Sequence, residues 1–265
     1  MEIKMKTKRI FKLITACFFS LCFLINACAT HETFNWYCIR EKDHIQPKCE
    51  SNMSFIEKYE GYYLDKNHTD YNSEKVIYLT FDAGYENGNI AKILDVLKER
   101  EVPAAFFVLS NIIKKDTAII KRMAEEGHTV CNHTASHKDM TKVNNFNEFK
   151  AELEKLETVY REYIGLDMAK FYRPPEGKFN EQNLRFANEL GYKTIFWSFA
   201  YADWDNNKQP SPEKAYNLIM NNIHNGAILL LHPTSNTNAE IIGRVIDDLK
   251  AQGFTFGTLE QLTSK

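Results

Sequence analysis

From residue 76 onward, short apolar runs alternate with longer amphipathic stretches, and this alternation limits the possible folds more than any other feature. The short runs have the length of buried strands, whereas the longer stretches repeat their apolar residues with helical spacing. We expect strands at 76–81, 104–109, 129–131, 170–172, 194–197, 227–231 and 254–256. We expect helices at 90–100, 117–125, 146–163, 181–190, 212–223 and 239–251.

Seven strand and helix units predict an α/β protein whose parallel strands are joined by crossover helices. Such a chain forms either an open doubly wound sheet or a (β/α) barrel. The sequence has no Gly-x-Gly-x-x-Gly turn and no phosphate-binding loop of the kind found in nucleotide-binding sheets. We therefore expect a (β/α) barrel, distorted or incomplete, with seven or eight strands.

Residues 1–29 form a separate segment with a basic start, an apolar run at 13–25 and small residues at 27–29. This is the anatomy of a secretory signal, and the apolar run is shorter than the roughly 20 residues of a membrane span. Two outcomes stay open, cleavage after the small residues or retention as an anchor, through the apolar run or a lipid on Cys28. Both predict an exported, extracytoplasmic protein, which touches the membrane only through this segment.

Residues 30–72 are rich in aromatic and polar side chains and are expected to be an ordered extension on the main domain, 73–265. Cys38 and Cys49 lie in this extension and either pair after export or remain thiols. Cys131 lies in an apolar strand and is expected to be a small core residue.

The charge balance gives no sign of a nucleic-acid partner. The first 29 residues hold five basic residues and one acid, so their removal changes the formal charge from −2 to about −6. A protein that binds nucleic acid needs a basic patch or stripe instead. We expect a monomer.

Polar residues recur at equivalent places along the chain. Each lies within a few residues of the carboxyl end of an expected strand: Asp82, His133, Arg173, Asp203 and His232. In a parallel barrel these ends meet at one rim, where catalytic side chains from different strands come together. Taken singly, each residue also has a structural explanation, such as a turn or a strand end. Their coincidence favours an active site.

The local sequence indicates what these residues could do. His133 and His137 are spaced so that two imidazoles can reach one cation, from a helix or from a tight loop. His232 is followed by Pro233, which disfavours a continuing helix and lets the imidazole project from the strand end. Arg173 begins a stiff, proline-rich turn that could hold its guanidinium against a carboxylate.

Five segments resemble, in order, the motifs of the polysaccharide deacetylases of carbohydrate esterase family 4, also called NodB-like proteins. The segments are 80–84 (TFDAG), 133–137 (HTASH), 173–177 (RPPEG), 203–204 (DW) and 230–232 (LLH). The resemblance extends from about residue 75 to the C-terminus. TFDAGYENG at 80–88 and FWSFAYADW at 196–204 further resemble the delta-lactam-biosynthetic de-N-acetylases, which act on muramic acid during spore cortex formation.

The resemblance implies a role for each central residue. Asp82 would be the general base that activates water, and His232 the general acid that protonates the departing amine. His133 and His137 would hold a divalent cation, with zinc expected, which polarises the acetamide carbonyl. Arg173 would tether Asp82.

The same resemblance implies which groups face the substrate. Tyr85, Trp204, Asp203 and Pro174 would contact the sugar, with Trp204 forming one wall of the site. A backbone N–H near Tyr85 or Gly84 would stabilise the oxyanion.

One position departs from the family pattern. Members of the family typically have a second Asp after the base, as third metal ligand, and this chain has Ala83 there. The muramic-acid subgroup also departs at this position, typically with Asn, so Glu86 or water would have to complete the metal site.

Three functions follow as hypotheses. The first is metal-dependent hydrolysis of the N-acetyl group of N-acetylmuramic acid in peptidoglycan strands, leading to the muramic delta-lactam of spore cortex. The second is deacetylation of N-acetylglucosamine in peptidoglycan or of chitin-like polymers. The third is glycan binding by a metal-free pseudoenzyme.

Overall fold

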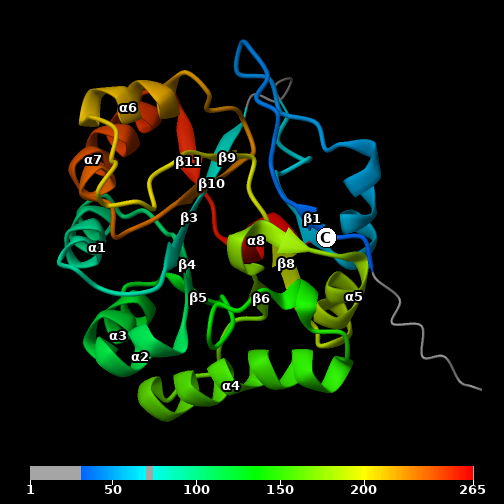
Figure 1. Ribbon diagram of the computed structural model, residues 1–265. Helices are drawn as coiled ribbons and strands as arrows, with labels where there is room; N and C mark the ends of the chain where they lie inside the picture. Colours follow the sequence, from blue (N-terminus) through cyan, green and yellow to red (C-terminus); the bar gives the residue numbers. More distant parts are fainter. Residues whose placement is uncertain (1–30, 70–73, 265) are drawn as a thin grey trace, which may run out of the picture. The chain divides into compact units, whose positions relative to one another are not determined.

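The computed structural model describes residues 31–69 and 74–264 of the 265-residue chain. The signal or anchor predicted at 1–29 lies outside these residues. His31–Lys265 form one compact unit, in which helices surround a curled sheet (Figure 1). The helices are α1 (Asn89–Glu99), α2 (Ser110–Lys115), α3 (Thr117–Glu125), α4 (Phe146–Ile164), α5 (Glu181–Glu189), α6 (Pro212–Met220), α7 (Asn236–Ala251) and α8 (Leu259–Thr263).

The main sheet is parallel at every registered strand pair, and its strands run in the order β2-β8-β6-β5-β4-β3-β10-β9, with β11 paired to β3. A separate antiparallel pair joins β1 to β7. The strands are β1 (Phe34–Asn35), β2 (Gly61–Tyr62), β3 (Lys75–Ala83), β4 (Ala105–Val108), β5 (Thr129–Asn132), β6 (Phe171–Tyr172), β7 (Lys178–Phe179), β8 (Lys193–Ile195), β9 (Phe199–Ala200), β10 (Ala227–Leu231) and β11 (Phe254–Phe256).

The curled sheet confirms the expected incomplete (β/α) barrel. The terminal strands of the order, β2 and β9, do not pair with each other among the described residues, so the barrel has an open seam. Only three residues of chain link β8 to β9, although the two strands stand near opposite ends of the sheet order. The expected strand at 194–197 therefore ends early, at Ile195, because the next residues cross the seam.

The two-residue period of β3 decides which side chains face the site. Ile77, Leu79 and Phe81 are buried in the large cluster that contains the apolar faces of α1 and α7. Val76 and Tyr78 belong to a second cluster on the other side of the sheet. Because side chains alternate along a strand, Thr80 and Asp82 share the side of Val76 and Tyr78 and face the barrel interior.

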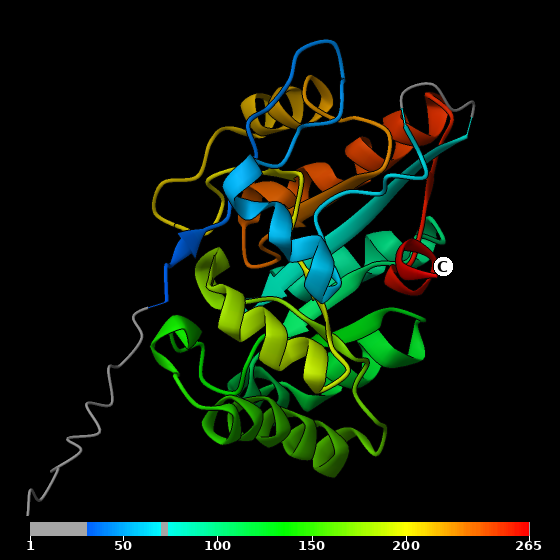
Figure 2. The same ribbon diagram turned by 90° about the vertical axis from the view of Figure 1, so that its right-hand side faces the viewer.

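The extension contributes to both the sheet and the core. Its strand β2 pairs with β8, and Leu64 forms an isolated antiparallel bridge with Ala227 of β10. A 3-10 helix, Ser51–Tyr59, lies beside α5 (Figure 2). Buried apolar residues of the extension share a third cluster with residues of the main domain: Trp36, Met53, Ile56, Tyr63, Leu64, Phe179, Leu184 and Phe196.

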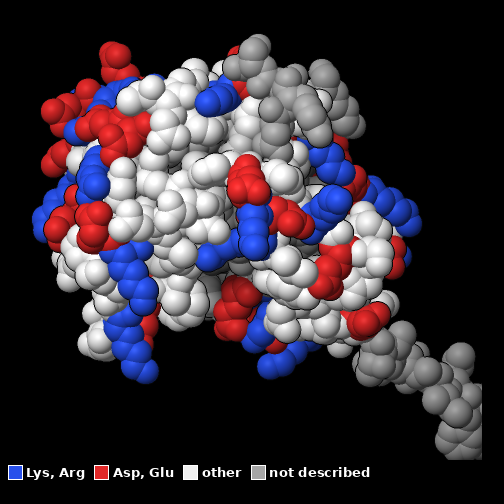
Figure 3. Space-filling view, turned by 90° about the horizontal axis from the view of Figure 1, so that it is seen from above, with Lys and Arg blue, Asp and Glu red and all other residues white. Residues whose placement is uncertain are grey.

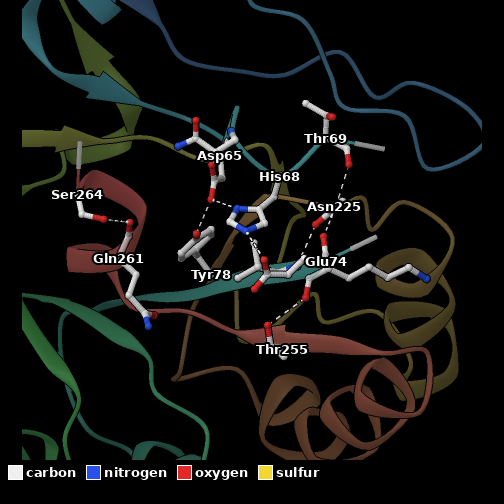
Figure 4. A network of polar contacts seen from close by, with 12 residues as sticks. Asp65, His68, Thr69, Glu74, Tyr78, Asn225, Thr255, Gln261 and Ser264 are labelled. Atoms are coloured by element: carbon white, nitrogen blue, oxygen red, sulfur yellow. Dashed lines mark hydrogen bonds and ion pairs between the residues drawn. The ribbon is translucent and has the colours of Figure 1, made fainter. Parts of the chain in front are cut away.

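A polar network fastens the extension to the amino ends of the strands (Figure 4). The buried Asp65 carboxylate accepts hydrogen bonds from the Tyr78 hydroxyl at 2.5 Å and pairs with His68 Nδ1 at 2.7 Å. Asn225 donates to the carbonyls of Thr69 and Glu74 at 3.0 and 2.7 Å. The residues that follow β2 are thus held at the end of the barrel opposite to the carboxyl ends of the strands.

Charged side chains are mixed on the surface. Figure 3 shows one face on which Lys and Arg lie among Asp and Glu, without a large area of one sign. Ion pairs such as Arg244 with Glu213, at 2.7 Å, link α7 to α6. Among residues 31–69 and 74–264, no helix combines the length and the apolar character that a membrane span requires.

Candidate active site

A pocket of about 720 Å³ lies at the carboxyl ends of the strands and brings together residues that are far apart in the sequence. Its polar lining includes Asp82 from the end of β3, His133 and His137 after β5, and His232 after β10. Aromatic side chains form much of the remaining wall, namely Tyr85, Trp197, Tyr201 and Trp204. The convergence expected from the sequence is therefore present in the structure.

Asp82 is paired with a buried cation. Its side chain is 11% exposed, and its Oδ1 accepts a hydrogen bond from Arg173 Nη1 at 2.8 Å. Its Oδ2 lies 3.5 Å from Nε2 of His133. Burial alone would raise the pKa of Asp82, but the charges of His133, Arg173 and His232 outweigh burial and hold the pKa below its ordinary value. Asp82 is therefore an ionised carboxylate, as a general base must be.

Arg173 is completely buried, and its donors are used in four directions. Besides Asp82, the guanidinium donates to the Thr80 hydroxyl at 2.9 Å and to the carbonyls of Ile195 and Phe196 at 2.9 and 3.1 Å. It also lies 4.1 Å from the centre of the Phe107 ring. Burial lowers the pKa of Arg173, which nevertheless stays charged because guanidinium is so strong a base. The residue ties Asp82 to the strand ends.

His133 and His137 lie in a loop after β5, so the open choice between helix and loop is settled as a loop. Their ring centres are 5.0 Å apart, with the planes inclined at 72°. His133 Nδ1 bonds to the Arg173 carbonyl at 2.9 Å. A carbonyl can only accept, so Nδ1 carries the hydrogen, and Nε2 keeps a lone pair on the side of Asp82. Burial lowers the pKa of His133 to about 4, so the ring is neutral near pH 7.

These two imidazoles are suitable metal donors, but they do not make a complete site. Among the described residues, no group of three or more His, Cys, Asp or Glu side chains is placed to hold a metal ion. The buried Ala83 has no ligand atom. Glu86, which we considered as a substitute, instead accepts backbone hydrogen bonds from Gly88 and Ile90 at the start of α1.

The Asp203 carboxylate holds the His232 side chain and backbone in place. Its Nδ1 lies 2.7 Å from Asp203 Oδ1, and its backbone N–H donates to Asp203 Oδ2 at 2.8 Å. Asn238 donates to the same Oδ2 at 2.6 Å and to the His232 carbonyl at 3.1 Å. Burial lowers the pKa of His232, but the hydrogen bond and the charge of Asp203, with the charge of Asp82, outweigh burial and raise it. A larger share of His232 is therefore protonated near neutral pH.

The expected substrate-facing residues divide into two groups. Tyr85 and Trp204 line the pocket and are 48% and 62% exposed, and the Tyr85 hydroxyl accepts a hydrogen bond from Asn206 at 2.7 Å. Asp203 is completely buried and bonded to His232, and Pro174 is also buried. Neither is among the residues that line the pocket. Both lie behind its wall, and their expected contact with the sugar stays a prediction.

Sequence reasoning missed several residues of the site, among them Trp197 and Asn238. Trp197 lines the pocket. Asn238, in the first turn of α7, donates a hydrogen bond to the Asp203 carboxylate. Trp197 lies just after a strand end, which is the position that singled out the other site residues. Asn238 has no such signal, because its role depends on how α7 packs under the pocket.

The cysteines of the described chain are all thiols. Cys131 is completely buried, as expected of a core residue, and burial raises its pKa well above the ordinary value. Cys38 and Cys49 are partly buried and unbonded to each other. Between the two alternatives for this pair, the structure shows the thiols.

Comparisons with known proteins agree with this geometry. The polysaccharide deacetylase family model matches residues 69–195. The Bacillus subtilis peptidoglycan-N-acetylmuramic acid deacetylase PdaA is 40% identical over 233 residues, 88% of this chain and 86% of the relative. A Bacillus cereus peptidoglycan-N-acetylglucosamine deacetylase is 34% identical over 219 residues, 80% of this chain and 76% of the relative.

Similarity in three dimensions leads to the same family. The solved structure of B. subtilis PdaA, described as a family 4 carbohydrate esterase, superposes with a TM-score of 0.81 at 40% identity and covers 87% of this chain and 97% of that one. Such identity over most of both chains reflects common descent, which a shared fold alone would not establish. The chain belongs to the polysaccharide deacetylase family, the family 4 carbohydrate esterases, and is a hydrolase of N-acetyl amide bonds.

Proposed function

We propose that the chain hydrolyses the N-acetyl group of N-acetylmuramic acid in peptidoglycan strands and so leads to the muramic delta-lactam of spore cortex. The observation that carries this proposal is the pairing of Asp82 and His232 in one pocket, with their pKa values shifted apart. An ionised carboxylate and a protonated imidazole divide the base and acid roles between them. The 40% identity to the muramic-acid deacetylase of B. subtilis supports the choice of sugar.

The reaction follows from these roles. Asp82 removes a proton from water, whose oxygen attacks the acetamide carbonyl. The resulting tetrahedral intermediate collapses with cleavage of the C–N bond, and His232 gives its proton to the departing amine. Acetate leaves, and the sugar keeps a free amine. Closure of that amine onto the lactyl carboxyl of the same sugar, with loss of water, would give the lactam.

Arg173 and Asp203 act through the groups that they hold. Arg173 fixes the direction of the Asp82 carboxylate and keeps it ionised. Asp203 accepts the Nδ1 hydrogen of His232, which leaves the Nε2–H of the protonated ring to face the pocket. We assign both as positioning residues. Trp204 and Tyr85 supply the exposed aromatic surface on which a sugar ring packs.

Family 4 deacetylases are generally metal-dependent, and we propose that His133 and His137 hold a divalent cation, zinc being the best match to two imidazoles. When bound, the cation would polarise the acetamide carbonyl. Zinc titration by calorimetry would test this assignment. Binding should be lost in His133→Ala and in His137→Ala, kept in Glu86→Ala, and tightened in Ala83→Asp, which restores a carboxylate. Equal zinc affinity in all four variants would contradict it.

Peptidoglycan lies outside the cytoplasm, so this substrate agrees with an exported protein, and we propose that residues 1–29 direct the export. The substrate would be peptidoglycan glycan strands. Peptide-free strands are the suitable probe, because the acetyl group and the lactyl carboxyl are then both accessible.

Mass spectrometry of peptide-free glycan strands would test the function. Wild type should remove acetyl groups from muramic acid, and Asp82→Asn should leave the strands unchanged. Loss of acetyl from glucosamine instead would favour the peptidoglycan N-acetylglucosamine or chitin-type alternative. Binding without any deacetylation by the metal-loaded wild type would favour the pseudoenzyme.

A further inference from the structure

The seam of the barrel is the place where the extension meets the active site. Residues 196–198 cross from β8 to β9, and Trp197, in the middle of this crossing, lines the pocket. The two neighbours of Trp197 in the chain are held by the strands on either side of the seam, because the Phe196 N–H donates to the Tyr62 carbonyl at 2.7 Å and the Ser198 N–H donates to the Ile228 carbonyl at 3.0 Å. The Trp197 carbonyl lies between these two contacts and is supported by hydrogen bonds from the extension instead.

Residues 34–40 of the extension supply that support, and we name them the strut. Phe34, Trp36 and Cys38 face inward: Trp36 is only 4% exposed, and Phe34 and Cys38 are partly buried. The intervening Tyr37 and Ile39 are 50% and 56% exposed. This alternation is that of an extended chain with one face against the protein. Only Phe34–Asn35 form a strand pair, with Lys178–Phe179.

The inward face of the strut donates hydrogen bonds to backbone carbonyls of three pocket-lining residues. The backbone N–H of Trp36 donates to the Gly177 carbonyl at 2.8 Å. The Trp36 indole and the Cys38 thiol both donate to the Trp197 carbonyl, at 2.8 and 3.2 Å.

Arg40, the last residue of the strut, also donates a hydrogen bond to the pocket wall. Its Nη2 donates to the Ala200 carbonyl at 2.6 Å, and its guanidinium lies 5.0 Å from the centre of the Phe199 ring. Both residues belong to β9, the last strand in the sheet order, and Ala200 lines the pocket.

The wall that the strut holds is tightly packed. The Trp36 ring stacks on Phe196 with centres 4.6 Å apart. A Cβ atom at Gly177 would come within 2.6 Å of the Trp197 ring and 3.3 Å of Trp36. Because interiors are close-packed, a shift of the strut would pass directly to the Trp197 ring in the pocket.

We propose that the strut is a specificity-determining element of the deacetylase: by fixing Gly177, Trp197 and Ala200, it sets the width of the pocket on the side of the seam, and therefore which sugar fits. This inference rests on the proposed function. The match to B. subtilis PdaA covers more of the chain than residues 73–265 can provide, so it extends into the extension. The strut residues are positioning residues, since they act through the wall.

Two variants remove single donors of the strut. Arg40→Ala removes the bond to Ala200 from an exposed residue, and Trp36→Phe removes the indole N–H but keeps an aromatic ring. Arg40→Lys retains a donor for the same carbonyl. Tyr37→Phe is the matched control, because Tyr37 faces outward and bonds to Glu50.

The measurements are kcat and KM on peptide-free muramic acid strands and on chitooligosaccharides, and calorimetric binding of both glycans to the same variants in an Asp82→Asn background. Loss of one hydrogen bond should raise KM and Kd for the muramic acid strands about three- to ten-fold in Arg40→Ala and Trp36→Phe, with kcat within about two-fold of wild type, and should change KM and Kd for chitooligosaccharides by a smaller factor, so that the preference between the two glycans shifts. Arg40→Lys should recover most of this loss, and Tyr37→Phe should resemble wild type.

The strut proposal would be overturned if Arg40→Ala and Trp36→Phe kept the wild-type KM and Kd while their melting temperatures fell, which is the result of a purely structural role. It would also be overturned if Tyr37→Phe showed the same rise in KM. The proposed function fails differently: wild type would deacetylate chitooligosaccharides and leave muramic acid strands intact. The strut would then be judged on KM for the chitooligosaccharide.

Discussion

Replacement of Arg173 by Met should destabilise the protein severely, because Met keeps much of the bulk of the side chain but removes every donor. Asp82 would lose its 2.8 Å partner inside the protein. Three other acceptors would lose a donor at the same time, namely Thr80 Oγ1 and the carbonyls of Ile195 and Phe196. Removal of one partner from a buried ion pair costs about 3–5 kcal/mol of unfolding free energy. For a unit of this size, that corresponds to a melting temperature lower by roughly 6–20 °C.

The stability that Arg173→Met loses should depend on pH. In the wild type the pKa of Asp82 is lowered on folding, so its contribution to stability is present above the unfolded pKa and is lost as pH falls through the folded pKa. In Arg173→Met, burial opposes the carboxylate without the guanidinium, and the pKa of Asp82 should rise. The loss of unfolding free energy should therefore be largest near neutral pH and should shrink as the pH falls through this raised pKa, because the buried acid then becomes neutral.

Urea unfolding followed by tryptophan fluorescence measures this deficit, and a double-mutant cycle with Asp82→Asn assigns it to the pair. Arg173→Met should cost about 2 kcal/mol less in the Asp82→Asn background, since no charge is then stranded. A loss below about 1 kcal/mol in the single variant, or strict additivity in the cycle, would refute the reasoning.

Three further outcomes are expected elsewhere. Asp203→Asn should lower the pKa of His232, move the alkaline limb of the kcat/KM profile to lower pH and reduce kcat about 10²- to 10⁴-fold; an unmoved limb would contradict the role of Asp203. Gly177→Ala should lower the unfolding free energy by about 1–3 kcal/mol, because φ is +67° and the new Cβ would meet Trp197 at 2.6 Å; urea melts identical to wild type would count against this. Cys131 should react with a thiol reagent only as fast as the protein unfolds, and rapid labelling of the native state would be inconsistent with its burial.

The sequence predicted the main strands because each is a buried apolar run followed by a helix with one apolar face. Short elements escaped this reasoning. β9 has two residues and α2 has six, which is too few for a period to show. The pairing of β2 with β8 joins residues far apart in the chain, and no local pattern encodes such a contact.

Only those site residues that follow the carboxyl end of an apolar strand could be predicted from the sequence. Asp82, His133 and His232 were found in this way, and they do line one pocket. Asp203 also lies near a strand end, yet its carboxylate turns inward to His232, and only the packed structure shows this. The role of the strut could not be predicted either, because it depends on an open seam between strands and on carbonyls of the wall, and every residue type has a carbonyl.

The central claim is that acetyl groups leave muramic acid, and a label can follow them directly. Peptide-free glycan strands carrying an isotope in the N-acetyl group of muramic acid only would be incubated with metal-loaded wild type and with Asp82→Asn, and the released acetate would be measured by mass spectrometry. We predict labelled acetate from wild type and none from Asp82→Asn. Unlabelled acetate alone, released from the glucosamine residues, would contradict the account.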